Sequence, residues 1–226
     1  MHKLTVLFVA AIFGLSYGDT GLGSCPSIQP VPQLEVNRLL GYWYVIQKTE
    51  AGSPCVSYNI TQNEQHLGKY KATSIEQHPT LWSSALYHEH RTTGDLSVID
   101  PKNPGHLALD LPLDIGTTSI TVFMTDYDNY AAIFTCKKLS LVHRWSIEIL
   151  SRTPTLNMDY VDKVRTRISS YNIDPFSLQI LDLSKCAAPG QQGSVIKTVS
   201  DIGHKATNVV SNVGQKINNL ATDPKA

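Results

Sequence analysis

Short alternations of apolar and polar residues dominate the chain between residues 41 and 150, and clusters of Gly, Pro, Asn, Asp or Ser separate them. This period of two is typical of strands, and the lack of helical segments between the runs indicates an antiparallel meander. A meander of this size favours a closed barrel, because closure leaves no unpaired edge. We predict strands at residues 43–49, 56–62, 69–76, 81–91, 106–111, 119–125, 131–136 and 143–150.

The period of the pattern changes after the eighth strand. Four apolar residues then recur at spacings of three and four, which predicts an amphipathic helix over residues 158–171. Pro175 ends this helix, and residues 176–183 are predicted as a short extra strand. The fold expected is therefore mainly β: an eight-stranded antiparallel up-and-down β-barrel with one C-terminal packed α-helix. The four helical positions are Val161, Val164, Ile168 and Tyr171.

The N-terminus and the cysteines indicate secretion. Lys3, the apolar run at residues 4–15 and the small residues Ser16 and Gly18 predict a signal peptide over residues 1–18. The apolar run is too short for a membrane-spanning helix. The cysteines form no CxxC pair, so in an oxidising compartment we expect two disulfides, and three pairings are open. The four cysteines are Cys25, Cys55, Cys136 and Cys186.

Asn59 begins an Asn-Ile-Thr sequence, which is an acceptor for N-glycosylation. In a secreted protein we expect Asn59 to be exposed and glycosylated.

The last forty residues differ in composition from the predicted barrel domain at 19–186. The segment 187–226 has no Trp, Tyr, Phe or Cys, and its apolar residues keep helical spacing between 195 and 220. Two interpretations stay open: an amphipathic helix on a lipid surface, and a disordered tail, since Gly203 and Gly214 weaken a helix. The whole chain balances 19 basic against 19 acidic residues, which argues against a nucleic-acid-binding protein.

Three motifs occur in order along the predicted strands. A Gly-x-Trp motif stands at residues 41–43, a Thr-Asp-Tyr-x-x-Tyr motif at residues 125–130, and Arg152 ends the eighth strand. At these spacings the motifs resemble the lipocalin family, and within it the group of apolipoprotein D, insect Lazarillo and the bilin-binding proteins. The resemblance covers residues 24–186.

The resemblance implies structural roles for the motif residues and a pairing of the cysteines. Arg152 would lie over the indole of Trp43 and seal one end of the barrel, a contact of roughly 1–2 kcal/mol when partly desolvated. The implied disulfides are Cys25–Cys136 and Cys55–Cys186. The residues given such structural roles are Gly41, Trp43, Thr125, Asp126, Tyr127 and Arg152.

The barrel of this family encloses one small ligand, and an eight-stranded barrel has room for it. Strand alternation, combined with the family's inward positions, predicts which side chains line the pocket. The opposite face of the eighth strand, with Trp145, Ile147 and Ile149, is expected to pack under the helix. The predicted pocket residues are Val45, Gln47, Tyr58, Ile60, Ile120, Val122, Met124, Ile133, Thr135, Ser146 and Glu148.

Glu148 departs from the family, whose carriers usually place Trp at this position. A carboxylate inside an apolar cup is costly unless it is paired or neutralised. Three interpretations are open: Glu148 anchors a polar or cationic group of the ligand, it occupies a wet position near the mouth, or the register of the strand is shifted by one residue.

Signals for catalysis and for metal binding are weak. The chain has no G-x-S-x-G, HExxH or phosphate-binding motif, and His88 and His90 have no third ligand at a suitable spacing. We therefore expect a secreted carrier, not an enzyme, without a metal or required cofactor, holding a fatty acid, sterol, retinoid or bilin. The alternative is a protein that binds a membrane, a lipoprotein surface or a partner through residues 195–220. No sequence feature predicts an oligomeric state.

Overall fold

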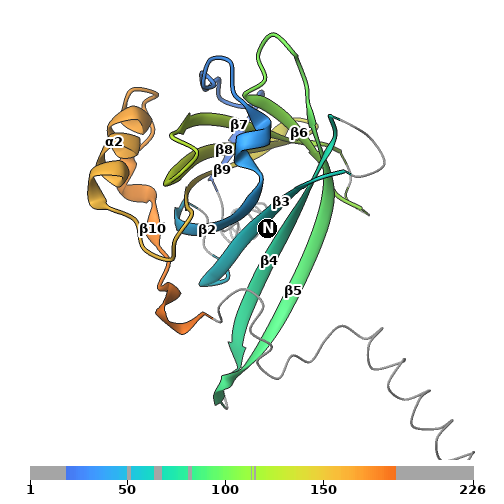
Figure 1. Ribbon diagram of the computed structural model, residues 1–226. Coiled ribbons are helices and arrows are strands. Elements are labelled where there is room, and N and C mark those ends of the chain that lie inside the picture. The colour runs from blue at the N-terminus through green and yellow to red at the C-terminus, as the bar shows by residue number, and fades with distance from the viewer. Residues whose placement is uncertain are drawn as a thin grey trace, which may run out of the picture.

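Eight consecutive antiparallel strands form a closed barrel in the computed structural model, and pairing between β2 and β9 closes it (Figure 1). The structure describes residues 19–49, 52–63, 68–80, 83–112, 114 and 116–186, so the predicted signal peptide and tail lie outside the described residues. The predicted barrel is confirmed. Its strands are β2 (Gly41–Lys48), β3 (Cys55–Gln62), β4 (Tyr70–Thr80), β5 (Ser83–Val98), β6 (His106–Asp110), β7 (Thr118–Thr125), β8 (Tyr130–Leu139) and β9 (Val142–Ser151).

Two short strands pair with β2 and β9, the two strands that close the barrel. β1 (Asp19–Leu22), which the sequence pattern did not predict, pairs with β9, and β10 (Gln179–Ile180) pairs with β2. The strand predicted at 176–183 is thus only two residues long. The Asp174 and Asp182 carboxylates accept hydrogen bonds from backbone N–H groups two residues ahead, which favours the turns η3 (Pro175–Ser177) and η4 (Leu183–Lys185) over an extended strand.

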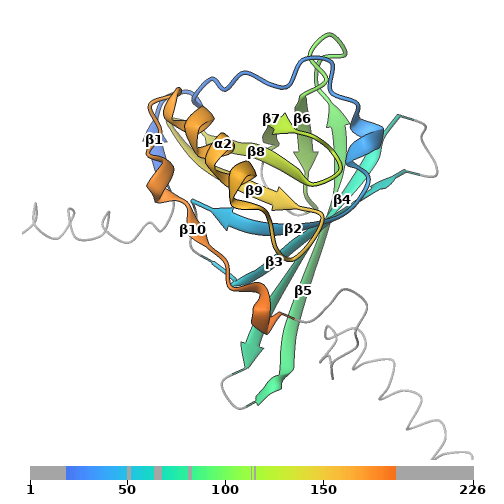
Figure 2. The same ribbon diagram turned by 60° about the vertical axis from the view of Figure 1, so that its left-hand side comes forward.

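The β4–β5 hairpin is the longest in the barrel and projects beyond the other strands (Figures 1 and 2). β5 continues to Val98, although the sequence pattern predicts its end at residue 91 and a connecting segment over residues 94–105. Gly94 lies instead inside β5, where the paired strand β6 comes so close that a Cβ would stand 2.7 Å from the backbone oxygen of Asp110. The glycine marks a close approach of two strands and not a chain reversal.

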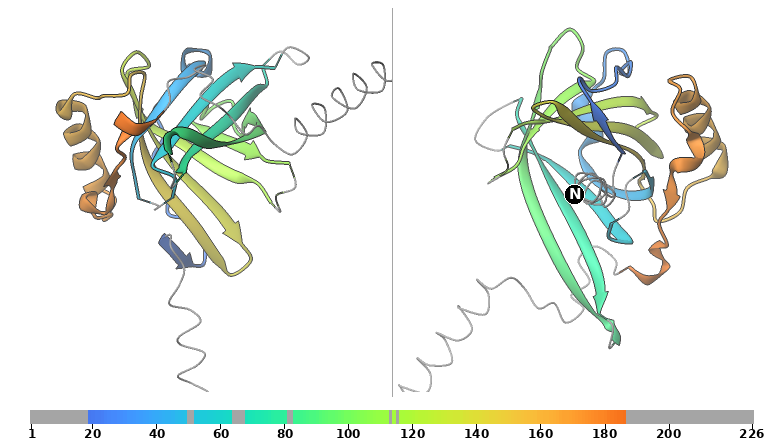
Figure 3. Two further views of the ribbon diagram at one scale, coloured as in Figure 1. Left: turned by 90° about the horizontal axis from the view of Figure 1, so that it is seen from below. Right: turned by 180° about the vertical axis from the view of Figure 1, so that it is seen from behind.

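Two apolar layers hold the barrel together. One layer fills the closed end inside the barrel, and the other lies between the barrel wall and α2 (Met158–Ser169). α2 runs along the outside of β8 and β9, as the side and rear views show (Figures 2 and 3). Ile147 and Ile149 pack in this outer layer with Trp145 beside them, as predicted. The helix contributes Val161, Val164 and Ile168.

Both disulfides join distant parts of the chain. Cys25–Cys136 ties the N-terminal segment to β8, and Cys55–Cys186 ties the end of the described chain to β3. The pairing implied by the family resemblance is confirmed. Within the described residues, no helix has the length and apolar character needed to span a bilayer.

Candidate functional site

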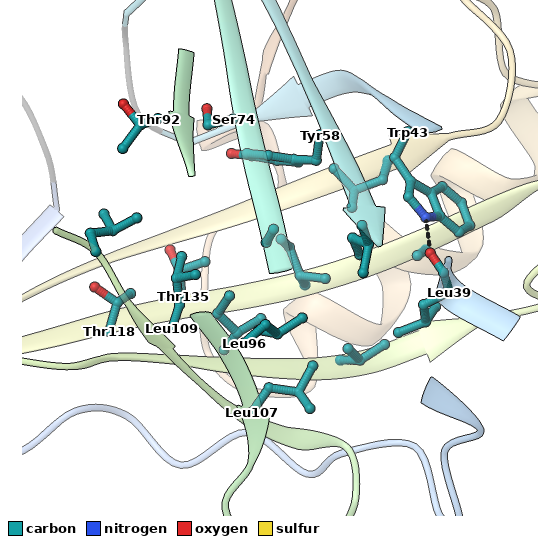
Figure 4. A pocket seen from close by; sticks show the side chains of 18 of the residues that line it. Leu39, Trp43, Tyr58, Ser74, Thr92, Leu96, Leu107, Leu109, Thr118 and Thr135 are labelled. Atoms are coloured by element: carbon teal, nitrogen blue, oxygen red, sulfur yellow. Dashed lines mark hydrogen bonds between the residues drawn. The ribbon is translucent and has the colours of Figure 1, made fainter. Parts of the chain in front are cut away.

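A cavity of about 300 Å³ lies inside the barrel. Leu39 and Trp43 close one end of it, while Thr92 and Thr118 stand at the other (Figure 4). Its size is at the lower end of the range for small-molecule sites in proteins. The lining consists of Leu39, Trp43, Tyr58, Ile60, Ala72, Ser74, Glu76, Thr92, Leu96, Leu107, Leu109, Leu111, Thr118, Ile120, Val122, Ala131, Ile133, Thr135 and Leu150.

Trp43 seals the closed end. Its side chain is fully buried, and its indole N–H donates a 2.8 Å hydrogen bond to the Leu39 carbonyl. The Arg152 guanidinium lies 3.6 Å from the centroid of the indole. Burial lowers the pKa of Arg152, although the Asp128 carboxylate opposes this shift. Gly41 admits the chain here with φ of +96°, a conformation that disfavours any residue with a Cβ.

The turn between β7 and β8 braces the same end. Burial disfavours the ionised form of Asp126, but hydrogen bonds from Tyr130 and Asn129 outweigh this and lower its pKa. The Thr125 hydroxyl accepts the Tyr127 N–H, and the Tyr127 carbonyl accepts a bond from Arg152. The motif residues therefore form a structural seal, in agreement with the roles implied by the resemblance.

The other end of the cavity is polar. Tyr58, Ser74 and Thr92 follow one another across β3, β4 and β5 in direct register, and Glu76 lies two residues beyond Ser74. Figure 4 shows the Tyr58 hydroxyl directed away from Trp43, toward the end where Ser74 and Thr92 lie. The cavity is thus amphiphilic, with an apolar closed end and hydroxyl and carboxylate groups opposite.

Glu148 is buried on the inner face of β9, with 7% of its surface exposed. Its neighbour along this face, Leu150, lines the cavity, whereas Glu148 contacts Tyr58. Burial raises the pKa of Glu148, and Glu76 adds to this, while the hydrogen bond from Tyr58 and the charge of Lys48 oppose it. Burial and the nearby Glu148 raise the pKa of Tyr58 well above its usual range. The Oε2 atom of Glu148 has no hydrogen-bond partner among the described residues.

Six of the eleven predicted pocket residues line the cavity: Tyr58, Ile60, Ile120, Val122, Ile133 and Thr135. Val45 belongs to the inner apolar layer but does not reach the cavity. Ser146 and Glu148 are buried on the predicted face of β9, beyond the lining itself.

The predictions for Gln47 and Met124 are wrong, because a β-bulge shifts the register at each site. One bulge falls between Val45 and Gln47, and the Gln47 side chain accepts a 3.0 Å hydrogen bond from Arg165 of α2. The other falls between Val122 and Met124, which packs with the outer layer. One extra residue on a strand reverses the facing of the residues that follow.

The sequence prediction omitted the lining residues of β4, β5 and β6. Ala72, Ser74 and Glu76 alternate with a period of two on β4, as do Leu107 and Leu109 on β6. This alternation is visible in the sequence. Once one residue of a strand is known to point into the barrel, the alternation identifies the other inward residues of that strand.

Asn59 and His90 are not among the residues that line the cavity. Asn59 falls between the inward residues Tyr58 and Ile60 and is half-buried on the outer side of β3. His90 interacts with the Thr92 hydroxyl at 3.0 Å, and the side chain of His88 lies outside the described residues. The described residues contain no group of three side chains suited to a metal ion.

Known proteins are similar to this chain in sequence and architecture. A model of the lipocalin / cytosolic fatty-acid binding protein family matches residues 89–182. Apolipoprotein D of Bos taurus is 28% identical over 184 residues, which cover 79% of this chain and 93% of that protein. The solved structure of insecticyanin from Manduca sexta is 20% identical with a TM-score of 0.58, covering 79% of this chain and 94% of insecticyanin. The tryptamine complex of the amine binding protein of Rhodnius prolixus is 17% identical with a TM-score of 0.58, covering 73% and 90%. In sequence and in its closed eight-stranded barrel, the chain therefore resembles the lipocalins.

Proposed function

We propose that the protein is an extracellular, non-enzymatic carrier that holds one small hydrophobic ligand inside its barrel. The observation that carries this proposal is the cavity, whose closed end is lined by Leu, Ile, Val and Trp side chains. Each square ångström of apolar ligand surface buried there contributes roughly 25 cal/mol. Two disulfides and the likeness to apolipoprotein D support an extracellular location.

The proposed ligand classes are fatty acids, sterols, retinoids and bilins. Lipocalins bind small hydrophobic molecules, and the proteins of similar fold include insecticyanin and a biogenic amine-binding protein. The first experiment is a visible absorption spectrum of the full chain purified from a secreting host, followed by mass spectrometry of the extracted ligand. A visible band indicates a bilin, and a colourless lipid extract indicates fatty-acid or sterol transport.

A cavity-filling variant tests whether binding takes place inside the barrel. Ala72 lines the cavity on β4, and its neighbour Thr73 lies on the outer face with its hydroxyl bonded to Thr93. Ala72→Phe should abolish binding of a neutral apolar fluorophore, whereas the matched outward change Thr73→Phe should leave it intact. If Ala72→Phe remains folded and binds as the parent does, the cavity is not the binding site.

A second candidate function, attachment to a lipid surface, rests on an exposed apolar patch. Leu22, Leu139, Leu141 and Val142 adjoin at the β8–β9 turn and β1, with 85%, 45%, 80% and 40% of their surfaces exposed. Such a patch favours contact with an apolar surface. The segment 195–220, proposed for the same role, lies outside the described residues. Liposome flotation separates the contribution of the exposed patch from that of the segment 195–220. It compares the full chain with a Leu141→Ser variant and with a chain truncated after residue 186. Flotation that survives both changes refutes this candidate.

A further inference from the structure

The polar end of the cavity carries a carboxylate. Glu76 lines the cavity, and the lining residues that the structure describes include no Lys, Arg or His. The ring hydroxyl of Tyr58 and the hydroxyls of Ser74 and Thr92 complete this end. These groups are acceptors for a donor-rich ligand head, and the carboxylate disfavours a ligand that brings a second negative charge.

Glu148 adds a second carboxylate behind Tyr58. Because the Tyr58 hydroxyl stays protonated, it donates its hydrogen to Glu148 and keeps its oxygen lone pairs available as acceptors. The Oε2 atom of Glu148 is buried and has no hydrogen-bond partner among the described residues, which is costly in a folded protein. A positive charge placed beside Tyr58 would offset that cost.

The positive charge of one residue of the barrel wall, Lys48, acts on Glu148. Lys48 is the register partner of Glu148 on β2, and its charge favours the ionised carboxylate without cancelling the effect of burial. Burial raises the pKa of Tyr58, and the Glu148 and Glu76 carboxylates add to this shift.

We propose that this end of the cavity binds the protonated amine of an amphiphilic ligand, with Glu76 and Tyr58 as direct partners and Glu148 as the residue that polarises Tyr58. The apolar body of the ligand fills the end near Trp43. This inference rests on the proposed carrier function and narrows its ligand class to ammonium amphiphiles, as against fatty acids with a carboxylate head.

Three probes with the same apolar body test the head-group preference: octylammonium, 1-octanol and octanoate. Each is titrated against the full-length protein loaded with a neutral fluorophore, and displacement gives its affinity. A charge-assisted hydrogen bond should make octylammonium bind about tenfold or more tightly than octanol, and octanoate should bind more weakly than octanol.

Substitutions that keep the shape of each side chain identify the groups responsible. Glu76→Gln, Glu148→Gln and Tyr58→Phe should each reduce the preference for octylammonium while octanol affinity stays within about threefold. The control is Glu35→Gln, which removes an exposed carboxylate at the closed end and should leave the preference unchanged. If none of the three variants lowers the preference, these residues are not the head-group site.

The pH profile separates a polarising role for Glu148 from a merely structural one. Tyr58, Lys48 and Glu76 face Glu148, while His78 lies 3.9 Å from Glu76 and His90 is its register partner. Since burial raises the pKa of Glu148, acidification neutralises it before ordinary carboxylates and weakens octylammonium binding. Glu148→Gln should flatten the part of this profile nearest neutrality, and octanol binding should show no such pH dependence.

The outcomes distinguish the inference from the function on which it rests. If octanol displaces the fluorophore and octylammonium binds no more tightly, the ammonium inference is wrong and the carrier function stands. If octanoate binds most tightly, the ligand is an anionic lipid. If no probe displaces the fluorophore and none binds directly, both proposals fail.

Discussion

Removal of the Arg152 guanidinium should destabilise the barrel strongly, because one side chain holds the closed end together. It stacks 3.6 Å from the indole centroid of Trp43. It also donates hydrogen bonds of 2.9 to 3.1 Å to four backbone carbonyls, those of Arg38, Leu40, Tyr42 and Tyr127. A partly desolvated cation–π contact contributes roughly 1–2 kcal/mol, and each hydrogen bond roughly 0.5–1.5 kcal/mol.

Water can reach part of this site and replaces some of the lost bonds, so Arg152→Ala is expected to cost about 3 kcal/mol of unfolding free energy. Arg152→Lys keeps a charge over the indole but loses the planar fork that reaches several carbonyls, and should cost about half as much. Urea unfolding followed by tryptophan fluorescence, with both disulfides intact, measures these values.

The matched control is Arg167→Ala on α2. Arg167 is exposed and also stacks on an aromatic ring, that of Tyr171, at 5.2 Å. Its removal should cost less than about 1 kcal/mol. An Arg152→Ala variant that unfolds at the same urea concentration as the Arg167→Ala control would refute the assignment of Arg152 as the main brace of the closed end.

Three further changes have expected outcomes. Replacing Cys25 and Cys136 by alanine should lower the unfolding free energy by up to about 4–5 kcal/mol, because the bond joins residues 111 positions apart; urea midpoints check this. Gly94→Ala should lower the melting temperature through a loss of roughly 1–3 kcal/mol, since its Cβ would meet the Asp110 oxygen at 2.7 Å. Glu148→Gln should stabilise the protein at neutral pH. Between the ordinary glutamate pKa and the raised pKa of Glu148, the folded protein binds more protons than the unfolded chain. The parent protein therefore loses stability as pH rises through this window, and the two proteins become equally stable in acid. Urea unfolding at several pH values measures the difference in unfolding free energy between them.

The order of the elements could be predicted from the sequence because each depends on local pattern. Period-two alternation located all eight barrel strands, and the change of spacing at Val161, Val164 and Ile168 located α2. The pairing of the cysteines was predictable only through the resemblance, because the four cysteines alone allow three pairings. The inward facing of Tyr58 and Ile60 followed from alternation combined with the inward positions of the family.

The bulges could not be predicted, and they decided the two wrong pocket assignments. The extra residue between Val45 and Gln47 has no local signature such as Gly or Pro, because it is set by the pairing of β2 with β9 across the whole chain. The same holds between Val122 and Met124. Gly94 was also misinterpreted, since a glycine required by the close approach of a neighbouring strand resembles a turn signal in the sequence.

The two faces of β9 explain why Glu148 can be present at all. On the outer face, Ile147 and Ile149 are almost fully buried against α2 and hold the strand in place. On the inner face, Leu150 extends the apolar floor of the cavity. Because these contacts fix the strand, an unfavourable buried carboxylate at Glu148 costs stability without moving the backbone. A residue that weakens the fold in this way is best explained by binding, and Glu148→Gln should therefore gain stability while it loses the preference for an ammonium head.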